Sequence, residues 1–250
     1  MDKSYAQSAK PGDLLDLANH YIVLITSSFY FESFQKLDES RKKIFAGFPE
    51  FRRAHSPKLY RHERETLTPA QSIEAVPLHV NPDIVSGKRI LTQDEQKCMD
   101  DFEINVVRPG IEFWNEVIDH GVVGFQASEI QATASNFDAF LQLLKKLRDS
   151  SFVRQVATEL NVPHASLIDT EWYTFRFLQA RLLHGLTLKY LSSDPHWHRP
   201  DEEQLEHDVH DIDYLTVGMH ACCFACNEST ASYRKLGWRF KFLCPEGRLL

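Results

Sequence analysis

The sequence predicts an α/β fold in which a parallel sheet is built from both ends of the chain around a helical middle. Residues 20–31, HYIVLITSSFYF, are rich in β-branched and aromatic residues, which is typical of a strand buried on both faces. Residues 201–244 show helix, strand, helix and strand patterns in turn. Because parallel strands are joined by right-handed crossover helices, this order favours parallel pairing.

The first strand is followed by an expected helix over 32–47, ESFQKLDESRKKIFAG, which Gly47 would end. Prolines then interrupt the chain repeatedly up to residue 91, so we expect loops with short helices there. Residues 92–119 have helical spacing of apolar residues, with a kink or break expected at Pro109 and Gly110. The middle of the chain is therefore expected to be mainly helical.

Two further helices are expected before the C-terminal region. Ser135 and Asp138 resemble a capping box in front of FLQLLKKL. Asp169 is a candidate N-cap for the long segment 171–191, EWYTFRFLQARLLHGLTLKYL. Both helices have the apolar content of core elements.

The last fifty residues predict the second half of the sheet. Residues 201–219 have a helical pattern, and ACCFAC at 221–226 is a short apolar strand. Residues 229–236 are expected to form a helix closed by Gly237, and WRFKFLC at 238–244 a second strand. We expect one domain over residues 1–250, with 48–165 as a largely helical insert within it.

Composition narrows the classes of protein to which the chain can belong. A net charge of -7 and a pI near 5.9 exclude an overall basic field that would attract nucleic acid. No apolar signal core and no membrane-spanning run are visible, and three of the five cysteines are bunched at 222–226. We therefore expect a cytoplasmic protein with reduced thiols and no membrane association.

A local basic run offers one possible contact with RNA. Its cations lie between residues 41 and 64, interleaved with histidines and a tyrosine, although such a run is more often a solvated face. The cations of this run are Arg41, Lys42, Lys43, Arg52, Arg53, Lys58, Arg61 and Arg64.

The segment LEHDVHDIDYLTVGMHACCFACNE at 205–228 contains the candidate chemistry. Asp208 and Asp211 are three residues apart and share a face of the predicted helix. Neighbouring carboxylates repel each other unless a cation or a proton lies between them, and oxygen ligands of this kind suit Mg²⁺ or Mn²⁺. Glu228 follows the predicted strand and could meet the two aspartates at its carboxyl end. An acidic face on an amphipathic helix is the simpler alternative.

The stretch DVHDIDYLTVGMHACCFACNESTASYRKLG resembles the C-terminal portion of PIN-like nuclease domains, and YIVLITSS resembles their first strand. The resemblance implies a three-layer sandwich with a central parallel sheet, and metal-dependent hydrolysis of phosphodiester bonds in RNA. By position, Asp208, Asp211 and Glu228 match the late acids of the family and would be its metal ligands. Thr26 and Ser27 would line the same site.

The match departs from the family at its first acid, where Ile25 stands. Loss of a metal-ligating carboxylate usually weakens binding and catalysis heavily, so a catalytically degraded module that binds RNA or a protein partner is the main alternative. The family also expects one more acid on a helix between the two ends of the chain. Its candidates are Asp100, Asp101, Glu103, Glu112 and Glu116.

Two other metal sites can be considered. The dipeptide His207–Asp208 is similar to the signature of HD-type phosphohydrolases, and His184, His196, His198 and His210 could complete such a site, but that fold is all-helical. Cys223 and Cys226 have C-x-x-C spacing, yet a second pair of ligands for zinc is missing from the sequence. We therefore expect a Mg²⁺- or Mn²⁺-dependent ribonuclease that acts through Asp208, Asp211 and Glu228, with non-catalytic binding as the alternative.

Overall fold

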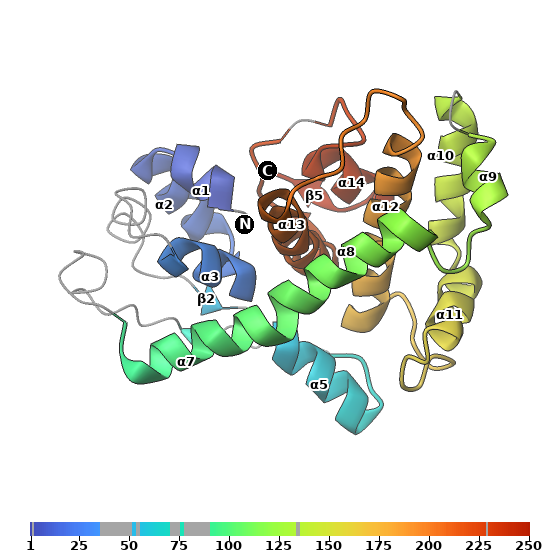
Figure 1. The fold of residues 1–250 in the computed structure, drawn as a ribbon. Coiled ribbons are helices and arrows are strands. Elements are labelled where there is room, and N and C mark those ends of the chain that lie inside the picture. The colour runs from blue at the N-terminus through green and yellow to red at the C-terminus, as the bar shows by residue number, and fades with distance from the viewer. Residues whose placement is uncertain are drawn as a thin grey trace.

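The computed structural model describes residues 1, 3–35, 52–53, 56–70, 76–77, 91–133, 136–228 and 230–250, and these residues are mostly helical (Figure 1). The predicted parallel sheet at the centre of a three-layer sandwich is wrong, because every described strand has two residues. Strand β1 (Leu24–Ile25) pairs in parallel with β2 (Arg52–Arg53), which pairs antiparallel with β3 (Val76–Pro77). Strand β4 (Cys223–Phe224) pairs in parallel with β5 (Arg248–Leu249).

Helices make up most of the described chain. In chain order they are α1 (Lys3–Ser8), α2 (Pro11–His20), α3 (Ser27–Gln35), α5 (Ser56–Thr66), α7 (Gln93–Phe102), the π-helical turn η1 (Glu103–Val107), α8 (Arg108–His120), α9 (Ala127–Gln131), α10 (Phe137–Lys145), the 3₁₀ turn η2 (Lys146–Arg148), α11 (Ser150–Glu159), α12 (Tyr173–Leu191), α13 (Glu202–His220) and α14 (Leu236–Leu243).

Helices α12 and α13 form the centre of the molecule and pack against each other. Both are buried around most of their circumference, as expected for helices surrounded by others. Figure 1 shows α7, η1 and α8 crossing them as one long rod, with α9, α10 and α11 on one side and α1, α2 and α3 on the other. The main apolar core joins residues from all of these regions and includes Trp114, Phe140, Leu183, Leu215 and Phe240.

The apolar run at 20–31 is a helix for its second half rather than one long strand. Helix α3 begins at Ser27, and its first turn is satisfied by polar groups. The Oγ1 of Thr26 accepts from the amide of Phe29 at 3.1 Å, and a carboxylate oxygen of Asp213 accepts from the amide of Ser28 at 3.0 Å. These acceptors supply the N-terminal cap that a helix needs. The extended part of the run is therefore limited to β1, and α3 follows it. The predicted helix 32–47 lies outside the described residues beyond Gln35.

The two C-terminal predictions after β4 are also wrong. The segment WRFKFLC forms most of α14 rather than a strand, and Gly237 lies inside this helix rather than closing an earlier one. The rings of Trp238 and Phe242, four residues apart, stack with centroids 4.9 Å apart, as helical geometry allows. Phe240 is fully buried on the same helix. Helical packing of the aromatic residues therefore replaces the expected strand alternation.

The middle of the chain confirms its helical expectation and shows how the predicted kink is accommodated. Thr92 caps α7, and its hydroxyl accepts from the amide of Glu95 at 3.2 Å. The π-helical turn η1 then comes directly before Pro109, at the start of α8. Such turns widen the hydrogen-bond spacing, so the rod continues past a proline that has no amide hydrogen to donate.

Two helix caps differ from their predictions. Helix α10 is capped by Asn136, whose Oδ1 accepts from the amide of Ala139 at 3.1 Å. Helix α12 is not capped by Asp169 but by Glu63 of α5, which is distant in sequence and only 1% exposed. The carboxylate of Glu63 accepts from the amides of Tyr173 at 2.6 Å and Thr174 at 2.9 Å. This buried cap fixes α5 against the start of α12.

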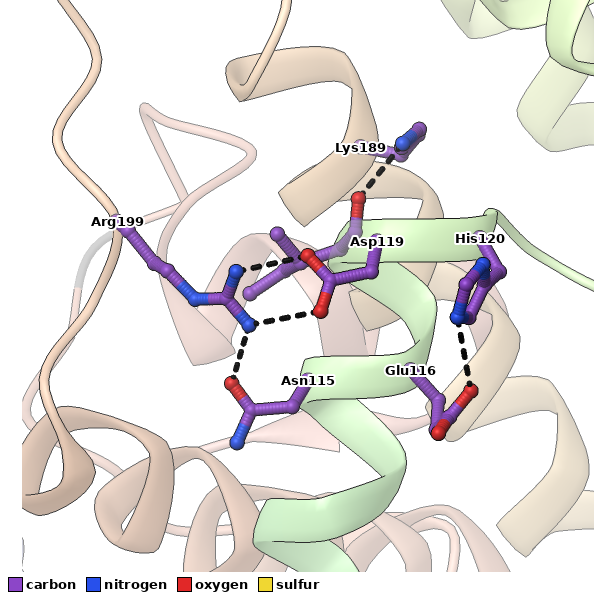
Figure 2. Close-up of polar contacts among 7 residues, drawn as sticks. Asn115, Glu116, Asp119, His120, Lys189 and Arg199 are labelled. Atoms are coloured by element: carbon purple, nitrogen blue, oxygen red, sulfur yellow. Dashed lines mark hydrogen bonds and ion pairs between the residues drawn. The ribbon is translucent and has the colours of Figure 1, made fainter.

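The loop between α12 and α13 is fastened to the end of α8 (Figure 2). Arg199 donates to both carboxylate oxygens of Asp119, at 2.7 and 3.1 Å, and to Asn115 at 2.7 Å. Lys189 of α12 donates to the carbonyl of Ile118 at 2.7 Å, which satisfies an acceptor in the last turn of α8. The pKa of Asp119 is lowered chiefly by the hydrogen bond from Arg199. These contacts set the position at which α13 begins.

The helix predicted over 201–219 is confirmed as α13. Asp201 caps it, and its side chain accepts from the amide of Gln204 at 2.9 Å. Among the described residues, no helix combines the length and the apolar character that crossing a membrane would require. All five cysteines are free thiols.

Candidate functional site

The predicted acidic face of α13 lies over α12 and α14. Asp208 faces His184 of α12, with 3.1 Å between its Oδ2 and the ring Nε2. The His184 side chain is only 2% exposed, whereas that of Asp208 is 23% exposed. Burial lowers the pKa of His184, and the nearby charge of Asp208 opposes this shift only in part. His184 is therefore neutral at pH 7 and presents one donor and one acceptor nitrogen.

Arg239 of α14 identifies which nitrogen of His184 is the acceptor. Its Nη1 lies 2.7 Å from Nδ1 of His184, and a guanidinium can only donate. The ring proton therefore belongs on Nε2, where it faces the carboxylate of Asp208. Arg239 also donates through Nε to the carbonyl of Tyr233 at 3.3 Å, and it is only 5% exposed. Arg239, His184 and Asp208 therefore form a row of polar side chains, of which Arg239 and His184 are buried.

Arg239 is the cation around which the predicted acids gather. Burial lowers its pKa, and the charges of Asp211, Asp208 and Glu228 raise it, in that order of strength. The charges of the three carboxylates assigned from the sequence therefore all act on this guanidinium, from α13 and from the segment after β4.

Asp208, Asp211, Glu228 and Arg239 are together called the acid cluster. Within it, Asp211 is the carboxyl group whose charged form is most disfavoured. Burial raises the pKa of Asp211 well above its ordinary value, and the charges of Asp208, Glu228 and Glu32 raise it further. The charge of Arg239 lowers it. A carboxyl group in this position gains from a proton or from an additional cation.

Glu228 has a structural partner of its own. One carboxylate oxygen accepts from the amide of Leu236 at 2.6 Å, which is the first residue of α14, and the other lies 3.2 Å from Nζ of Lys235. A carboxylate at a helix N-terminus satisfies a free amide and interacts favourably with the helix dipole. Glu228 therefore positions the helix that carries Arg239.

Thr26 and Ser27 are buried at the start of α3, each 1% exposed. Thr26 caps the first turn, and the neighbouring Ser28 binds Asp213 of α13 rather than one of the three predicted acids. Ile25, which stands where PIN-like domains have their first acid, is fully buried in the apolar core. This part of the predicted site is thus part of the scaffold.

A divalent cation does not fit the acid cluster as it is arranged here. Among the described parts of the chain, no three His, Cys, Asp or Glu side chains are placed to hold a metal ion. Asp208 is paired with His184, Glu228 is used as a helix cap, and the charge of Arg239 already interacts with all three carboxylates. Mg²⁺ or Mn²⁺ would have to compete with each of these partners.

Sequence reasoning missed a second polar group, which contains Glu32 of α3 and whose charge also acts on Asp211. The hydroxyl of Tyr214 donates to Glu32, and Nδ1 of His207 lies 3.7 Å from its other carboxylate oxygen. Burial alone would raise the pKa of Glu32, but His207, His210 and Tyr214 lower it overall. The hydrogen bond with Glu32 raises the pKa of His207. Glu32 was hidden because the sequence placed it in a surface helix after a strand.

The other metal hypotheses find little geometric support. His207 and Asp208 face different partners, Glu32 and His184, so the dipeptide does not converge on one point. His196 and His198 are exposed in the loop before α13. Of the thiols at the proposed C-x-x-C pair, Cys226 is buried and Cys223 is partly exposed. The acids proposed for the middle of the chain are also not among the charges that raise the pKa of Asp211. These acids are Asp100, Asp101, Glu103, Glu112 and Glu116.

The described part of the predicted basic run lies on α5. Lys58, Arg61 and Arg64 are exposed there, next to the exposed side chains of Tyr60 and His62. The predicted cations Arg41, Lys42 and Lys43 lie outside the described residues, as do the side chains of Arg52 and Arg53.

Comparison with known proteins gave no match to a family model, to a curated protein or to a solved structure.

Proposed function

We propose that this chain is a non-catalytic binding module whose acid cluster is neutralised from within. The observation that carries the proposal is Arg239, buried at 5% exposure and in electrostatic contact with Asp208, Asp211 and Glu228. A buried guanidinium with a hydrogen bond to His184 is an unfavourable group to displace, because its removal leaves several carboxylates without a counter-charge. The cluster then holds α12, α13 and α14 together.

Metal-dependent hydrolysis of phosphodiester bonds in RNA remains a second candidate, favoured by one observation. Three other carboxylates raise the pKa of Asp211, and a divalent ion would relieve this repulsion. Asp208, Asp211 and Glu228 would be its ligands. Since the present arrangement gives these groups other partners, no catalytic step is assigned to them.

RNA is the partner that we propose for the exposed face of α5. Lys58, Arg61 and Arg64 are spaced three residues apart and follow one side of the helix. With three phosphate contacts, the logarithm of the binding constant should fall with the logarithm of salt concentration with a slope of about -2 for a single strand. The net charge of -7 predicts weak binding overall.

One pair of assays on the same samples tests the proposal. A fluorescent single-stranded RNA is mixed with the protein in Mn²⁺ or Mg²⁺, and both anisotropy and cleavage are followed. We expect binding without cleavage, and weaker binding after the triple change Lys58→Gln, Arg61→Gln and Arg64→Gln. The matched control is Lys10→Gln, Lys97→Gln and Lys145→Gln, three exposed lysines outside α5. Metal-dependent cleavage that Asp211→Asn abolishes would establish the second candidate instead, and no RNA binding would redirect the search to protein partners.

The compartment proposed for this module is the cytoplasm. The free state of all five cysteines supports a reducing environment, in which thiols persist.

A further inference from the structure

A hollow of about 440 Å³ lies between α1, α3 and α13, beside the acid cluster but formed by different side chains. Four carboxylates and two imidazoles line it, and Lys3 is its single basic side chain other than histidine. The lining residues are Lys3, Glu32, Glu202, Glu203, Glu206, His207 and His210. Its volume is within the range of small-molecule sites, about 300–1,000 Å³.

His210 is the feature of this hollow that points to a ligand. Its side chain is only 2% exposed and lines the hollow, yet neither ring nitrogen has a hydrogen-bond partner among the described residues. The nearest carboxylate oxygen, of Glu206, is 3.6 Å from Nε2, which is beyond a normal hydrogen bond. Leaving a buried polar group unsatisfied is costly, so such groups call for a specific explanation.

The surroundings of His210 hold its ring in one orientation. The rings of Phe31 and Phe102 pack against it, with centroid distances of 5.5 and 6.3 Å, and Phe102 is nearly parallel to it. The imidazole thus stands at the wall of an acidic hollow, with both ring nitrogens buried and without a hydrogen bond among the described residues. In its neutral form the imidazole has one acceptor nitrogen, and an acceptor among carboxylates is suited to a ligand that donates hydrogen bonds and has positive charge.

We propose that this hollow binds a linear aliphatic polyamine. Glu202, Glu203 and Glu206 lie on the first turns of α13, where residues four apart are separated by about 6 Å along the axis, and Glu32 faces them from α3. Several ammonium groups on one flexible chain match carboxylates arranged along a line better than one compact ion does. The proposal goes beyond the RNA-binding function and does not depend on it.

The same observations argue against a metal ion as the occupant. The hollow is much larger than one ion requires, and no three candidate ligands among the described residues are placed to share one. A polyamine instead reaches the carboxylates one at a time through charge-assisted hydrogen bonds. The imidazole of His210 accepts a further one.

Isothermal titration of the purified full chain with spermidine, at 150 mM salt, tests the proposal. We expect binding that weakens by about tenfold or more in Glu203→Gln/Glu206→Gln, since each lost charge-assisted hydrogen bond is worth about that factor. The matched control Glu159→Gln/Glu171→Gln removes two exposed carboxylates elsewhere and should leave binding unchanged. Equal weakening in the control would show a non-specific charge effect and would overturn the proposal.

His210→Phe separates a ligand contact from a structural role. The phenyl ring fits the same aromatic surroundings without unsatisfied nitrogens, so the variant should bind spermidine at least about tenfold more weakly while its melting temperature does not fall. Undiminished binding in this folded variant would contradict the proposal. The absence of spermidine binding to the wild type would also overturn it. A metal site would replace the proposal if the wild type bound Mn²⁺ or Zn²⁺ but not spermidine, and if Glu203→Gln/Glu206→Gln removed the metal binding. If His210→Phe fails to fold, the exposed double variant still decides the question.

Discussion

Replacing Arg239 by Met tests how strongly the acid cluster depends on its internal cation. The change keeps an apolar side chain of similar length but removes the positive charge that lowers the pKa of Asp211 most strongly. It also removes the donor 2.7 Å from Nδ1 of His184. Removing one partner of a buried charged pair typically costs about 3–5 kcal/mol. We expect the free energy of unfolding to fall by that amount.

Urea unfolding at pH 7 measures this loss. With a slope of about 3 kcal/mol per molar urea, the midpoint should fall by about 1 M or more. Asp211→Asn should recover part of the loss in the double variant, with a coupling of about 0.5–3 kcal/mol, because it removes a carboxylate that Arg239 no longer neutralises. The control Arg108→Met removes an exposed guanidinium and should change stability by less than about 0.5 kcal/mol. A loss below about 1 kcal/mol, or no coupling with Asp211→Asn, would refute the account of the cluster.

Three other predictions follow from buried groups. Glu63→Ala should destabilise the protein by about 1–3 kcal/mol, because it leaves two amides at the start of α12 without their acceptor; chemical unfolding measures the loss, and an unchanged midpoint would contradict the role of this cap. The pKa of His184 in the folded state is lowered below its unfolded value of 6.5, so the unfolded chain takes up more protons and stability should fall as the pH drops through about 6.5. His184→Gln should flatten this pH dependence, and a profile identical to that of the wild type would contradict the role of His184. Gly218→Ala should destabilise by about 1–3 kcal/mol, since the added Cβ would lie 2.9 Å from the ring of Phe224, and a neutral effect on the melting temperature would show that the ring can move away.

The sequence predicted α13 well because its signals are local. Asp201 is a good N-cap, and the apolar residues behind the acidic turn repeat at helical spacing. The same spacing placed Asp208 and Asp211 on one face, which is where the structure has them in contact with the charge of Arg239. For this helix, the signals from neighbouring residues were therefore sufficient.

The fold class could not be predicted from local signals. Aromatic and β-branched residues are common in strands, but they also pack between helices. HYIVLITSSFYF and WRFKFLC therefore satisfied the strand criteria, although the second half of the first segment and most of the second fold as helices. The carboxylates that cap α12 and α14, Glu63 and Glu228, lie before the helix they cap and not in the capping position. Only tertiary contacts identify such caps.

The identity of the central cation was hidden for the same reason. Arg239 was assigned to a strand, where its direction could not be linked to α13. The sequence held one usable signal for His210, because Glu206 and His210 are four residues apart on one helix face. A pair of this kind becomes informative only when a third group from another helix, here Glu32, is seen beside it.

Calorimetric titration of the wild-type chain with Mn²⁺, alongside Asp208→Asn and Asp211→Asn and with RNA cleavage followed on the same samples, tests the central claim most directly. If Arg239 neutralises the acid cluster, the wild type should show no Mn²⁺ binding that either substitution removes, and none of the three proteins should cleave RNA. Mn²⁺ binding and RNA cleavage in the wild type that both disappear in the two variants would contradict the claim and make the acid cluster a metal-dependent active site.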